Sequence, residues 1–259
     1  MYDPNMRDRR VSTRRDGFDR GSSLGGWCTL SGTFSAELFA RLGFDYVCID
    51  RQHGLMSEAD MTACIALLDA LAVSLVVRVS SGGAAEIGRA LDAGADGIIV
   101  PMVESAVEAS AAANACRYAP RGSRSFGPIR PIMARGTASH SEIDGPVRCI
   151  VMVESAAGVE QADKIAATPG VDGIYIGPGD LAIALGLEPA TAARERSFVD
   201  AVEHTIAAGR RAGRTVGMHC ADAQGARDAL ARGFDFATAC VDSGLLQAAA
   251  GAQAQIARS

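Results

Sequence analysis

The chain of 259 residues is long enough to bury a large core, and with 48% hydrophobic and 21% charged residues it has the composition of a folded globular protein, not a disordered or fibrous one. A formal net charge of -5 and a single tryptophan beside four tyrosines disfavour a nucleic-acid partner, because such a chain offers little attraction to phosphates and few stacking platforms. No apolar stretch approaches the length of a membrane span and the first 20 residues lack the apolar core of a signal peptide, so we expect no membrane contact and a cytoplasmic location.

Residues 1–22 hold six arginines and four aspartates with little apolar content, and we predict a solvated charged tail or an interface arm there. The single domain that we predict over residues 23–259 contains short apolar runs rich in valine and isoleucine. Such runs are typical of strands buried on both faces. The eight predicted strands cover residues 25–30, 45–50, 75–79, 97–101, 149–153, 173–177, 215–219 and 236–241.

Alanine-rich segments with helical spacing separate these strands. We predict helices over residues 35–42, 57–72, 84–93, 105–118, 156–167, 194–212, 222–232 and 245–257. Four of them are followed by a glycine placed to end the helix, namely Gly43, Gly94, Gly213 and Gly233. Eight alternating strands and helices in roughly 235 residues predict an α/β fold, a closed (β/α)8 TIM barrel. An open doubly wound sheet is the alternative, but the first strand-to-helix turn lacks the G-x-G-x-x-G fingerprint.

Three further features stand out along the chain. Residues 119–148 form a long insertion, which we expect to be a functional or interface loop. The pentapeptide Met-Val-Glu-Ser-Ala occurs at 102–106 and again at 152–156, so that each copy places a glutamate just beyond a strand, as a repeated barrel unit would. The seven cysteines are scattered and contain no C-x-x-C pair, which predicts reduced residues, several of them in the core.

In a barrel the loops that follow the strands form the active site, so polar residues at the carboxyl ends of the predicted strands are the candidate functional residues. They are Asp50, Arg51, Gln52 and His53 after the second strand, Arg78 at the end of the third, Glu154 after the fifth, Asp180 after the sixth and His219 at the end of the seventh. We expect these groups to converge on one mouth of the barrel.

Glu154 and Asp180 follow adjacent predicted strands. Each has a purely structural alternative, because a carboxylate is favoured in the first turn of a helix and aspartate is a common N-cap residue. Two carboxylates at one mouth repel each other unless a cation lies between them, which favours a metal site. Hard oxygen ligands without a zinc-like cluster of cysteine and histidine predict Mg2+ or Mn2+, with the remaining positions left to water and substrate.

Arg78 lies inside an apolar run, where an unpaired guanidinium is costly, so it must meet a carboxylate, and we expect one from the substrate in preference to one from the protein. His53 follows Asp50 by three residues, which suits a base tuned by that carboxylate as well as an ordinary loop histidine. His219 suits a pocket residue or a core histidine.

The segment Gly177-Pro178-Gly179-Asp180 precedes Leu181 at a predicted helix start. Backbone N–H groups there are free to bind a carboxylate or a phosphate. Glu104 provides an internal comparison for Glu154, because both glutamates lie in the same pentapeptide. Only the expected pairing with Asp180 favours Glu154 as a ligand.

Six stretches resemble one known family. They are CIDRQHG (48–54), VVRVS (76–80), GADGIIVPMV (94–103), VMVES (151–155), GVDGIYIGPGDLA (170–182) and VDSGLL (241–246). They are similar to the HpcH/HpaI family of metal-dependent, class II pyruvate aldolases, which is related to the citrate lyase β-chain superfamily. The resemblance extends over nearly the whole chain from Leu24 onward.

The resemblance implies a (β/α)8 barrel whose last helix is exchanged between neighbouring subunits of a homo-oligomer, a hexamer or trimer of dimers. It also implies a divalent metal ion, Mg2+, Mn2+ or Co2+, held by Glu154 and Asp180. At the matching positions, Arg78 would hold the pyruvyl oxygens and stabilise the enolate, and His53 would transfer protons.

The same resemblance places Asp92 near His53 across a subunit contact. It also implies that the backbone N–H groups of Gly179 and Asp180 receive the pyruvate carboxylate.

Four more residues complete the predicted site. Asp50 is expected beside the catalytic histidine, and Gln52, Trp27 and His219 are expected to bind substrate. Two positions depart from the family pattern. Gln52 stands where the best-known members have glutamate, which removes a charge near the base, and Met152 stands where glutamine is frequent.

The single lysine decides between aldolase classes. A Schiff-base aldolase needs a lysine inside the barrel, whereas Lys164 falls in a helix of the predicted outer ring. We therefore predict reversible, metal-dependent cleavage of a 4-hydroxy-2-oxo acid to pyruvate, or to a related 2-oxo acid such as hydroxypyruvate, and an aldehyde. Two alternatives are a ligand-binding barrel without turnover and a lyase of acyl-CoA thioesters. The CoA phosphates of such a thioester could bind Arg121, Arg124, Arg130 and Arg135.

Overall fold

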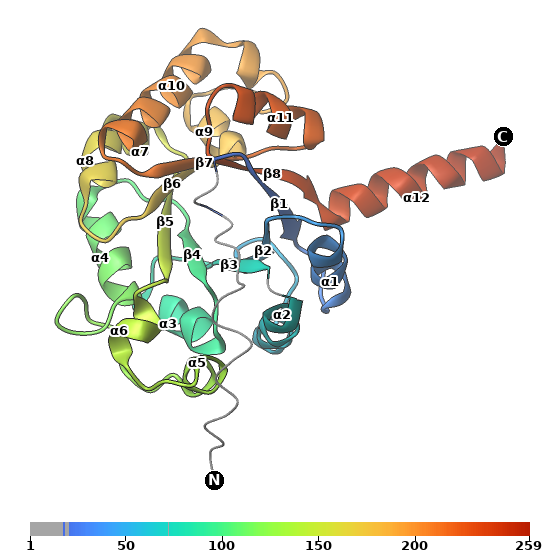
Figure 1. The fold of residues 1–259 in the computed structure, drawn as a ribbon. Coiled ribbons are helices and arrows are strands. Elements are labelled where there is room, and N and C mark those ends of the chain that lie inside the picture. Colours follow the sequence, from blue (N-terminus) through green and yellow to red (C-terminus); the bar gives the residue numbers. More distant parts are fainter. Residues whose placement is uncertain (1–17, 19–20, 72) are drawn as a thin grey trace.

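The computed structural model describes Phe18, residues 21–71 and residues 73–259. Eight parallel strands close into a barrel in chain order, with β1 paired to β8 (Figure 1). The strands are β1 (Ser23–Cys28), β2 (Tyr46–Asp50), β3 (Ser74–Arg78), β4 (Gly97–Val100), β5 (Arg148–Val153), β6 (Gly173–Ile176), β7 (Thr215–His219) and β8 (Phe236–Val241). The predicted (β/α)8 barrel is confirmed, and the open doubly wound sheet is wrong.

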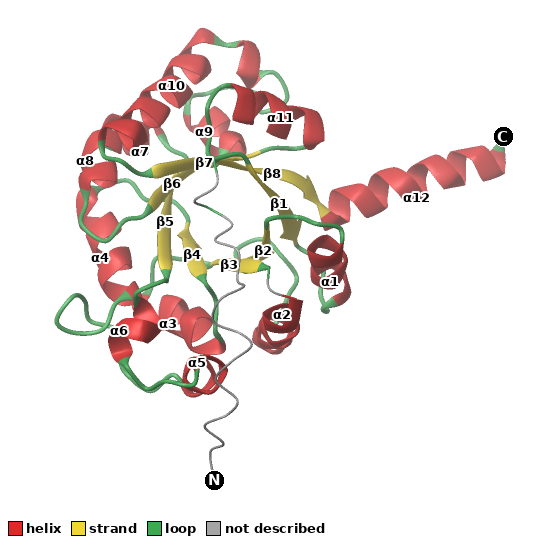
Figure 2. Ribbon diagram, viewed as in Figure 1, coloured by secondary structure: helices red, strands yellow, loops and turns green. Residues whose placement is uncertain are grey.

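Helices surround the barrel on its outside (Figure 2). They are α1 (Phe34–Arg41), α2 (Glu58–Leu71), α3 (Ala84–Ala93), α4 (Ala106–Cys116), α5 (Ile129–Arg135), α6 (His140–Asp144), α7 (Ala156–Glu160), α8 (Ala162–Ala167), α9 (Pro178–Ala184), the 3-10 helix η2 (Ala192–Arg194), α10 (Arg196–Arg211), α11 (Ala223–Ala231) and α12 (Asp242–Arg258). The insertion at 119–148 thus contains α5 and α6, and the helix predicted over 156–167 is broken at Gln161. Positive φ angles at Gly43, Gly94, Gly213 and Gly233 confirm the four predicted glycine helix ends.

The first strand begins and ends two residues earlier than predicted. Its ladder stops at Cys28 because the next two backbone N–H groups bind a side chain instead of a neighbouring strand. Asp242, the first residue of α12, accepts hydrogen bonds from the backbone of Thr29 at 2.8 Å and of Leu30 at 3.2 Å. This carboxylate therefore joins the end of β1 to the start of the last helix.

Aromatic side chains fill the interior of the barrel. The rings of Trp27 and Tyr175 stack with their centroids 5.8 Å apart, and Tyr175 stacks on Phe236 at 5.5 Å. Two inward-facing glycines make the room: a Cβ atom at Gly217 would lie 2.2 Å from the Phe236 ring, and one at Gly25 would lie 2.0 Å from the Tyr46 ring. The barrel is a packed core below its mouth, and only the layer at the carboxyl ends of the strands is available for chemistry.

Phe18 corrects part of the predicted charged tail. Its side chain is 2% exposed and packs against Tyr46 and Phe236 at centroid distances of 5.1 and 5.2 Å. At this residue the expectation of a solvated segment is wrong, because an aromatic ring among charged neighbours gains free energy by covering the apolar barrel core. The rest of the predicted tail up to residue 20 lies outside the described residues.

The last helix, α12, projects away from the barrel (Figure 1). Among its residues only Asp242 is buried, while Leu245, Leu246 and Ile256 are 51%, 60% and 67% exposed. A helix with exposed leucines and few contacts to its own chain is expected to pack elsewhere. In the described part of the chain, no helix combines the length and the apolarity needed to cross a bilayer.

The close packing of Gly217 against the Phe236 ring predicts that adding one methyl group at Gly217 destabilises the barrel. We expect Gly217→Ala to lower the free energy of unfolding by about 1–3 kcal/mol, since the new Cβ overpacks the barrel against Phe236. Gly127→Ala is the matched control, because Gly127 lies outside the helices and strands and a Cβ atom there would have no neighbour within 4 Å among the described residues. Urea unfolding at a fixed protein concentration measures both, and combining Gly217→Ala with Phe236→Leu should restore part of the loss.

Candidate active site

A buried ion pair joins the carboxyl ends of β2 and β3. Asp50 and Arg78 are register partners on these strands, and their side chains form two hydrogen bonds, with Nε donating to Oδ1 at 2.9 Å and Nη2 donating to Oδ2. Asp50 is 1% exposed and Arg78 is 9% exposed. The expectation that Arg78 meets a substrate carboxylate in preference to a protein one is therefore corrected: its partner within the chain is Asp50.

Asp50 also organises the loop that follows it. Its Oδ1 atom accepts hydrogen bonds from the backbone N–H groups of Gln52 at 3.0 Å and His53 at 3.2 Å, and its Oδ2 atom accepts one from the indole of Trp27 at 3.3 Å. Burial raises the pKa of Asp50, but the hydrogen bonds and charge of Arg78 outweigh burial and hold this pKa below its ordinary value. Asp50 is thus a fixed anion that positions its neighbours.

His53 lies at the rim of the mouth. Its contact with Asp50 runs through the backbone N–H, and within the described residues its exposed imidazole makes no hydrogen bond. The neighbouring Gln52 holds its side-chain Oε1 atom buried without a hydrogen-bond partner among those residues. Two adjacent residues of the loop after β2 therefore carry polar groups, an imidazole and an amide oxygen, that have no side-chain hydrogen bond among the described residues.

Glu154 directly follows β5 and is 1% exposed. Its Oε1 atom accepts a hydrogen bond from the backbone of Met102 at 2.8 Å, whereas Oε2 is buried and accepts none from the described part of the chain. Burial raises the pKa of Glu154 to about 7; the hydrogen bond from Met102 opposes the rise, and the negative charge of Asp180 adds to it. An orphaned carboxylate oxygen near a second carboxylate is the arrangement that a divalent cation relieves.

Asp180 lies in the first turn of α9 and is exposed. Among the described residues, no three His, Cys, Asp or Glu side chains gather closely enough to hold a metal ion. A cation bound by Glu154 and Asp180 would therefore complete its coordination shell with water and substrate oxygens, as Mg2+ commonly does. The residues present fit a hard divalent ion.

Two neighbours of Glu154 have roles that the sequence did not predict. A Cβ atom at Gly177 would lie 2.0 Å from Glu154 Oε2, so the glycine makes room for the carboxylate. Met102 adopts a positive φ of 54°, rare for a residue with a side chain, and its N–H points at Oε1. The glycine was visible in the segment 177–180, but nothing local marks a left-handed methionine.

The two copies of the pentapeptide share a helix cap and differ in their glutamates. Ser105 and Ser155 both cap helices, with Oγ accepting from the backbone N–H three residues ahead. Glu104 is exposed because β4 ends four residues before it, whereas β5 ends directly before Glu154. The repeat is therefore a capping motif, and strand length decides which glutamate reaches the mouth.

Trp27 links the remaining polar groups. The guanidinium of Arg78 lies 5.0 Å from the centre of its ring, and the imidazole of His219 meets it edge-on at 4.8 Å and 80°. Burial lowers the pKa of His219 to about 4, and the positive charge of Arg78 contributes to this shift. The His219 ring is consequently neutral at pH 7.

Asp92 lies away from these groups. It occupies the last turn of α3, which runs back from the carboxyl end of β3 toward the other end of the barrel. Its carboxylate is 43% exposed and pairs with Arg124 Nη2 at 2.6 Å. The structure therefore does not bring Asp92 to His53 within one chain.

The arginines of the insertion are engaged within their own chain. Arg121 pairs with Asp144, Arg130 with Asp69 and Arg124 with Asp92, and Arg135 donates to a backbone carbonyl. Guanidinium groups committed to carboxylates are poorly placed to bind the phosphates of CoA. This weakens the alternative of a thioester lyase.

Lys164 lies on α8, outside the barrel, and is exposed. Gly179 and Asp180 lie in the first turn of α9, where the backbone N–H groups have no partner within the helix. These N–H groups are available to a carboxylate at the mouth, and the lysine is not.

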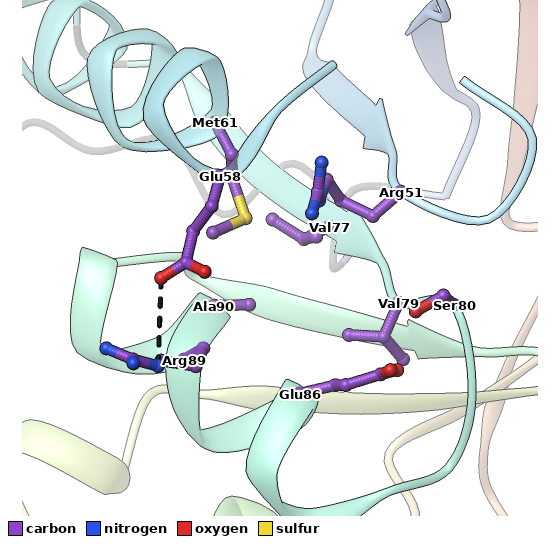
Figure 3. A pocket seen from close by; sticks show the side chains of 9 residues that line it. All are labelled: Arg51, Glu58, Met61, Val77, Val79, Ser80, Glu86, Arg89 and Ala90. Carbon is purple, nitrogen blue, oxygen red and sulfur yellow. Dashed lines mark ion pairs between the residues drawn. The ribbon is translucent and has the colours of Figure 1, made fainter. Parts of the chain in front are cut away.

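A separate pocket lies outside the barrel, between β3 and the helices α2 and α3 (Figure 3). Its lining consists of Arg51, Glu58, Met61, Val77, Val79, Ser80, Glu86, Arg89 and Ala90. Glu58 and Arg89 face each other there at 3.6 Å, and Arg51 donates to the carbonyl of Met56. None of the residues around Glu154 lines this pocket, so it is distinct from the mouth.

Comparison with known proteins gives a consistent match. Residues 24–249 match the family described as HpcH/HpaI aldolase/citrate lyase. A hydroxypyruvate/pyruvate aldolase of Rhizorhabdus wittichii is 39% identical over 88% of this chain and 91% of its own length. A 4-hydroxy-2-oxovalerate aldolase of Rhodococcus jostii is 35% identical over 74% of this chain and 76% of its own. The crystal structure of an HpcH/HpaI family protein from Burkholderia cenocepacia is 32% identical, with a TM-score of 0.83, over 95% of this chain and 97% of that one.

The neutral state of His219 predicts a pH effect on stability. The unfolded state has a histidine pKa near 6.5 and the folded state one near 4, so between these values the unfolded chain binds more protons. Stability due to the neutral ring is present above pH 6.5 and is lost as the pH falls toward 4. Relative to His219→Gln, the wild type should lose about 3 kcal/mol of unfolding free energy from pH 7 to pH 4.

Urea unfolding of metal-free protein across this pH range measures the difference. His140→Gln is the control, because His140 is exposed and should follow the wild type. Parallel pH profiles for the wild type and His219→Gln would contradict the prediction.

Proposed function

Because the chain belongs to the HpcH/HpaI aldolase/citrate lyase family, we propose that it is a metal-dependent pyruvate aldolase. The reaction is reversible cleavage of a 4-hydroxy-2-oxo acid to pyruvate, or to a related 2-oxo acid such as hydroxypyruvate, and an aldehyde. Relatives named for pyruvate, hydroxypyruvate and 4-hydroxy-2-oxovalerate aldolase activity support this substrate class. The observation that carries the proposal is the buried Oε2 atom of Glu154, which has no hydrogen-bond partner among the described residues and lies close to Asp180 and to the Arg78–Asp50 pair.

Glu154 and Asp180 are the proposed metal ligands, for Mg2+, Mn2+ or Co2+. When bound, a divalent ion supplies a Lewis acid that draws electron density from the keto and carboxylate oxygens of the 2-oxo acid. Arg78 adds a fixed positive charge, because its two hydrogen bonds to Asp50 hold the guanidinium in place before substrate arrives. The free N–H groups of Gly179 and Asp180 receive the substrate carboxylate.

His53 is the proposed proton carrier. In the cleavage direction its imidazole takes the proton of the C4 hydroxyl, the C3–C4 bond breaks, and its electron pair forms the enolate of the 2-oxo acid while the aldehyde leaves. A proton returned to C3 completes pyruvate. The exposed imidazole supports this role, since it is free to reach substrate. Lys164, exposed on α8, is in no position to form a Schiff base in the barrel.

Assembly is proposed to complete the site. A homo-oligomer, a hexamer or trimer of dimers, with α12 exchanged between neighbours, would bury the leucines that α12 exposes in the single chain. Asp92 of a second copy is proposed to approach His53, and its partly exposed carboxylate supports a contact with another subunit. Seven unpaired cysteines, six of them buried, support a reducing, cytoplasmic location.

Enolisation of pyruvate tests the proposed function without knowledge of the aldehyde. In D2O, chelated enzyme should leave the pyruvate methyl protons in place, and restored Mg2+ or Mn2+ should produce exchange that NMR detects. Glu154→Gln should lower this exchange on the order of 100-fold or more, since it removes a charged ligand.

Glu104→Gln is the matched control, because Glu104 occupies the same place in the pentapeptide as Glu154 but is exposed. It should exchange like the wild type. Absence of exchange in metal-loaded wild type would remove the central step of the proposal and favour a barrel without this turnover.

The proposed exchange of α12 between subunits predicts the mass of the protein in solution. Light scattering should give the wild type a mass several times 26.7 kDa, and replacing both Leu245 and Leu246 by glutamate should shift it toward that value, because charges would enter the proposed interface. Gln247→Glu adds a charge to the same helix without removing a leucine and is the control. An unchanged mass in the double variant would argue against the interface.

A further inference from the structure

His219 faces the interior of the mouth. It ends β7 two residues after Gly217, and alternate residues of a strand point to the same side. Gly217 lies on the inner side, because a Cβ there would enter the Phe236 ring inside the barrel. The edge-on contact of the His219 ring with Trp27 agrees with this direction. His219 therefore stands one layer above the aromatic core, in the same layer as the Arg78–Asp50 pair.

The ring nitrogens of His219 have no hydrogen-bond partner among the described residues. A neutral ring carries one hydrogen-bond donor and one acceptor. Trp27 Nε1 is already bound to Asp50, Asp50 is bound to Arg78, and the Tyr175 hydroxyl is paired with Thr238. Across the described residues, no hydrogen bond reaches the His219 ring, which is only partly buried. The edge-on contact with Trp27 therefore holds a ring whose donor and acceptor have no partner among the described residues and remain available to a ligand at the mouth.

We propose that His219 is a specificity-determining residue that hydrogen-bonds a hydroxyl group of the substrate. The inference rests on the proposed aldolase function and deepens it. The hydroxyl has two possible sources with the same chemistry: C3 of a hydroxylated 2-oxo acid, such as hydroxypyruvate, or the carbon next to the carbonyl of a hydroxyaldehyde, such as glycolaldehyde.

A hydroxyl group suits the His219 ring better than a carboxylate or an apolar substituent does. The proposed site already binds the substrate carboxylate through the backbone N–H groups of Gly179 and Asp180, and a neutral imidazole offers a carboxylate no charge. An apolar substituent would cover the ring nitrogens and leave them unpaired, which costs free energy. Sites that hydrogen-bond a substrate hydroxyl discriminate strongly against analogues that lack it. Proton transfer belongs to His53, because burial beside Arg78 makes His219 a weak base.

Two pairs of substrates separate the sources. With acetaldehyde fixed, kcat/KM is compared for hydroxypyruvate and pyruvate; with pyruvate fixed, it is compared for glycolaldehyde and acetaldehyde. His219→Leu should reduce the preference for the hydroxylated partner in one of the two arms on the order of 10-fold or more. His219→Gln, which keeps a donor and an acceptor, should retain most of that preference. Unchanged preferences in both arms of His219→Leu would overturn the proposal.

A second measurement does not depend on turnover. The chain has four histidines, so 15N-labelled imidazoles give a simple NMR spectrum in which the His219→Gln variant identifies the His219 resonances. Hydroxypyruvate or glycolaldehyde should shift these resonances more than pyruvate or acetaldehyde does, and equal responses to all four probes would contradict the inference. The proposed aldolase function is tested separately, because it fails if the metal-loaded wild type does not exchange the pyruvate methyl protons.

Discussion

A carboxylate buried at the end of a parallel strand must be neutralised, and in this barrel Arg78 does so for Asp50 from the adjacent strand. Removing one partner would leave an uncompensated charge in the core, which is strongly destabilising. The pair also has geometric consequences. Asp50 fixes the backbone of Gln52 and His53 and the indole of Trp27, and Trp27 in turn orients Arg78 and His219. The positions of most polar groups at the mouth therefore follow from one ion pair.

The second buried carboxylate is left in the opposite condition. Glu154 receives one backbone hydrogen bond and forms no ion pair within the described part of the chain, and burial near Asp180 keeps its pKa high. Gly177 keeps space open at its unpartnered oxygen, although an alanine would cost less conformational entropy on folding. The mouth thus holds two buried carboxylates of different kinds. Asp50 has hydrogen bonds to both oxygens and positions its neighbours, whereas Glu154 has one oxygen without a partner among the described residues and is suited to binding a cation. That contrast, more than the number of acidic residues, supports the proposed metal site at Glu154.

The sequence predicted the arrangement of elements closely, because buried parallel strands and amphipathic helices leave strong local patterns. It also placed Asp50, Arg78, Glu154 and His219 at strand ends, where a barrel puts its chemistry. It did not predict that Phe18 is buried, because its neighbours are charged and its partners, Tyr46 and Phe236, are distant in the chain. Nor did it predict the early end of β1, which depends on the carboxylate of Asp242.

Periodicity and residue type were enough to predict the barrel, its eight strands and the set of polar residues at one end of it. Which of these residues meet became clear only in the folded barrel. It paired Arg78 with Asp50, buried Glu154 but not Glu104 of the identical pentapeptide, and set Asp92 against Arg124. The physical reason is that pairing depends on strand register and strand length, which are set by contacts between segments far apart in the chain.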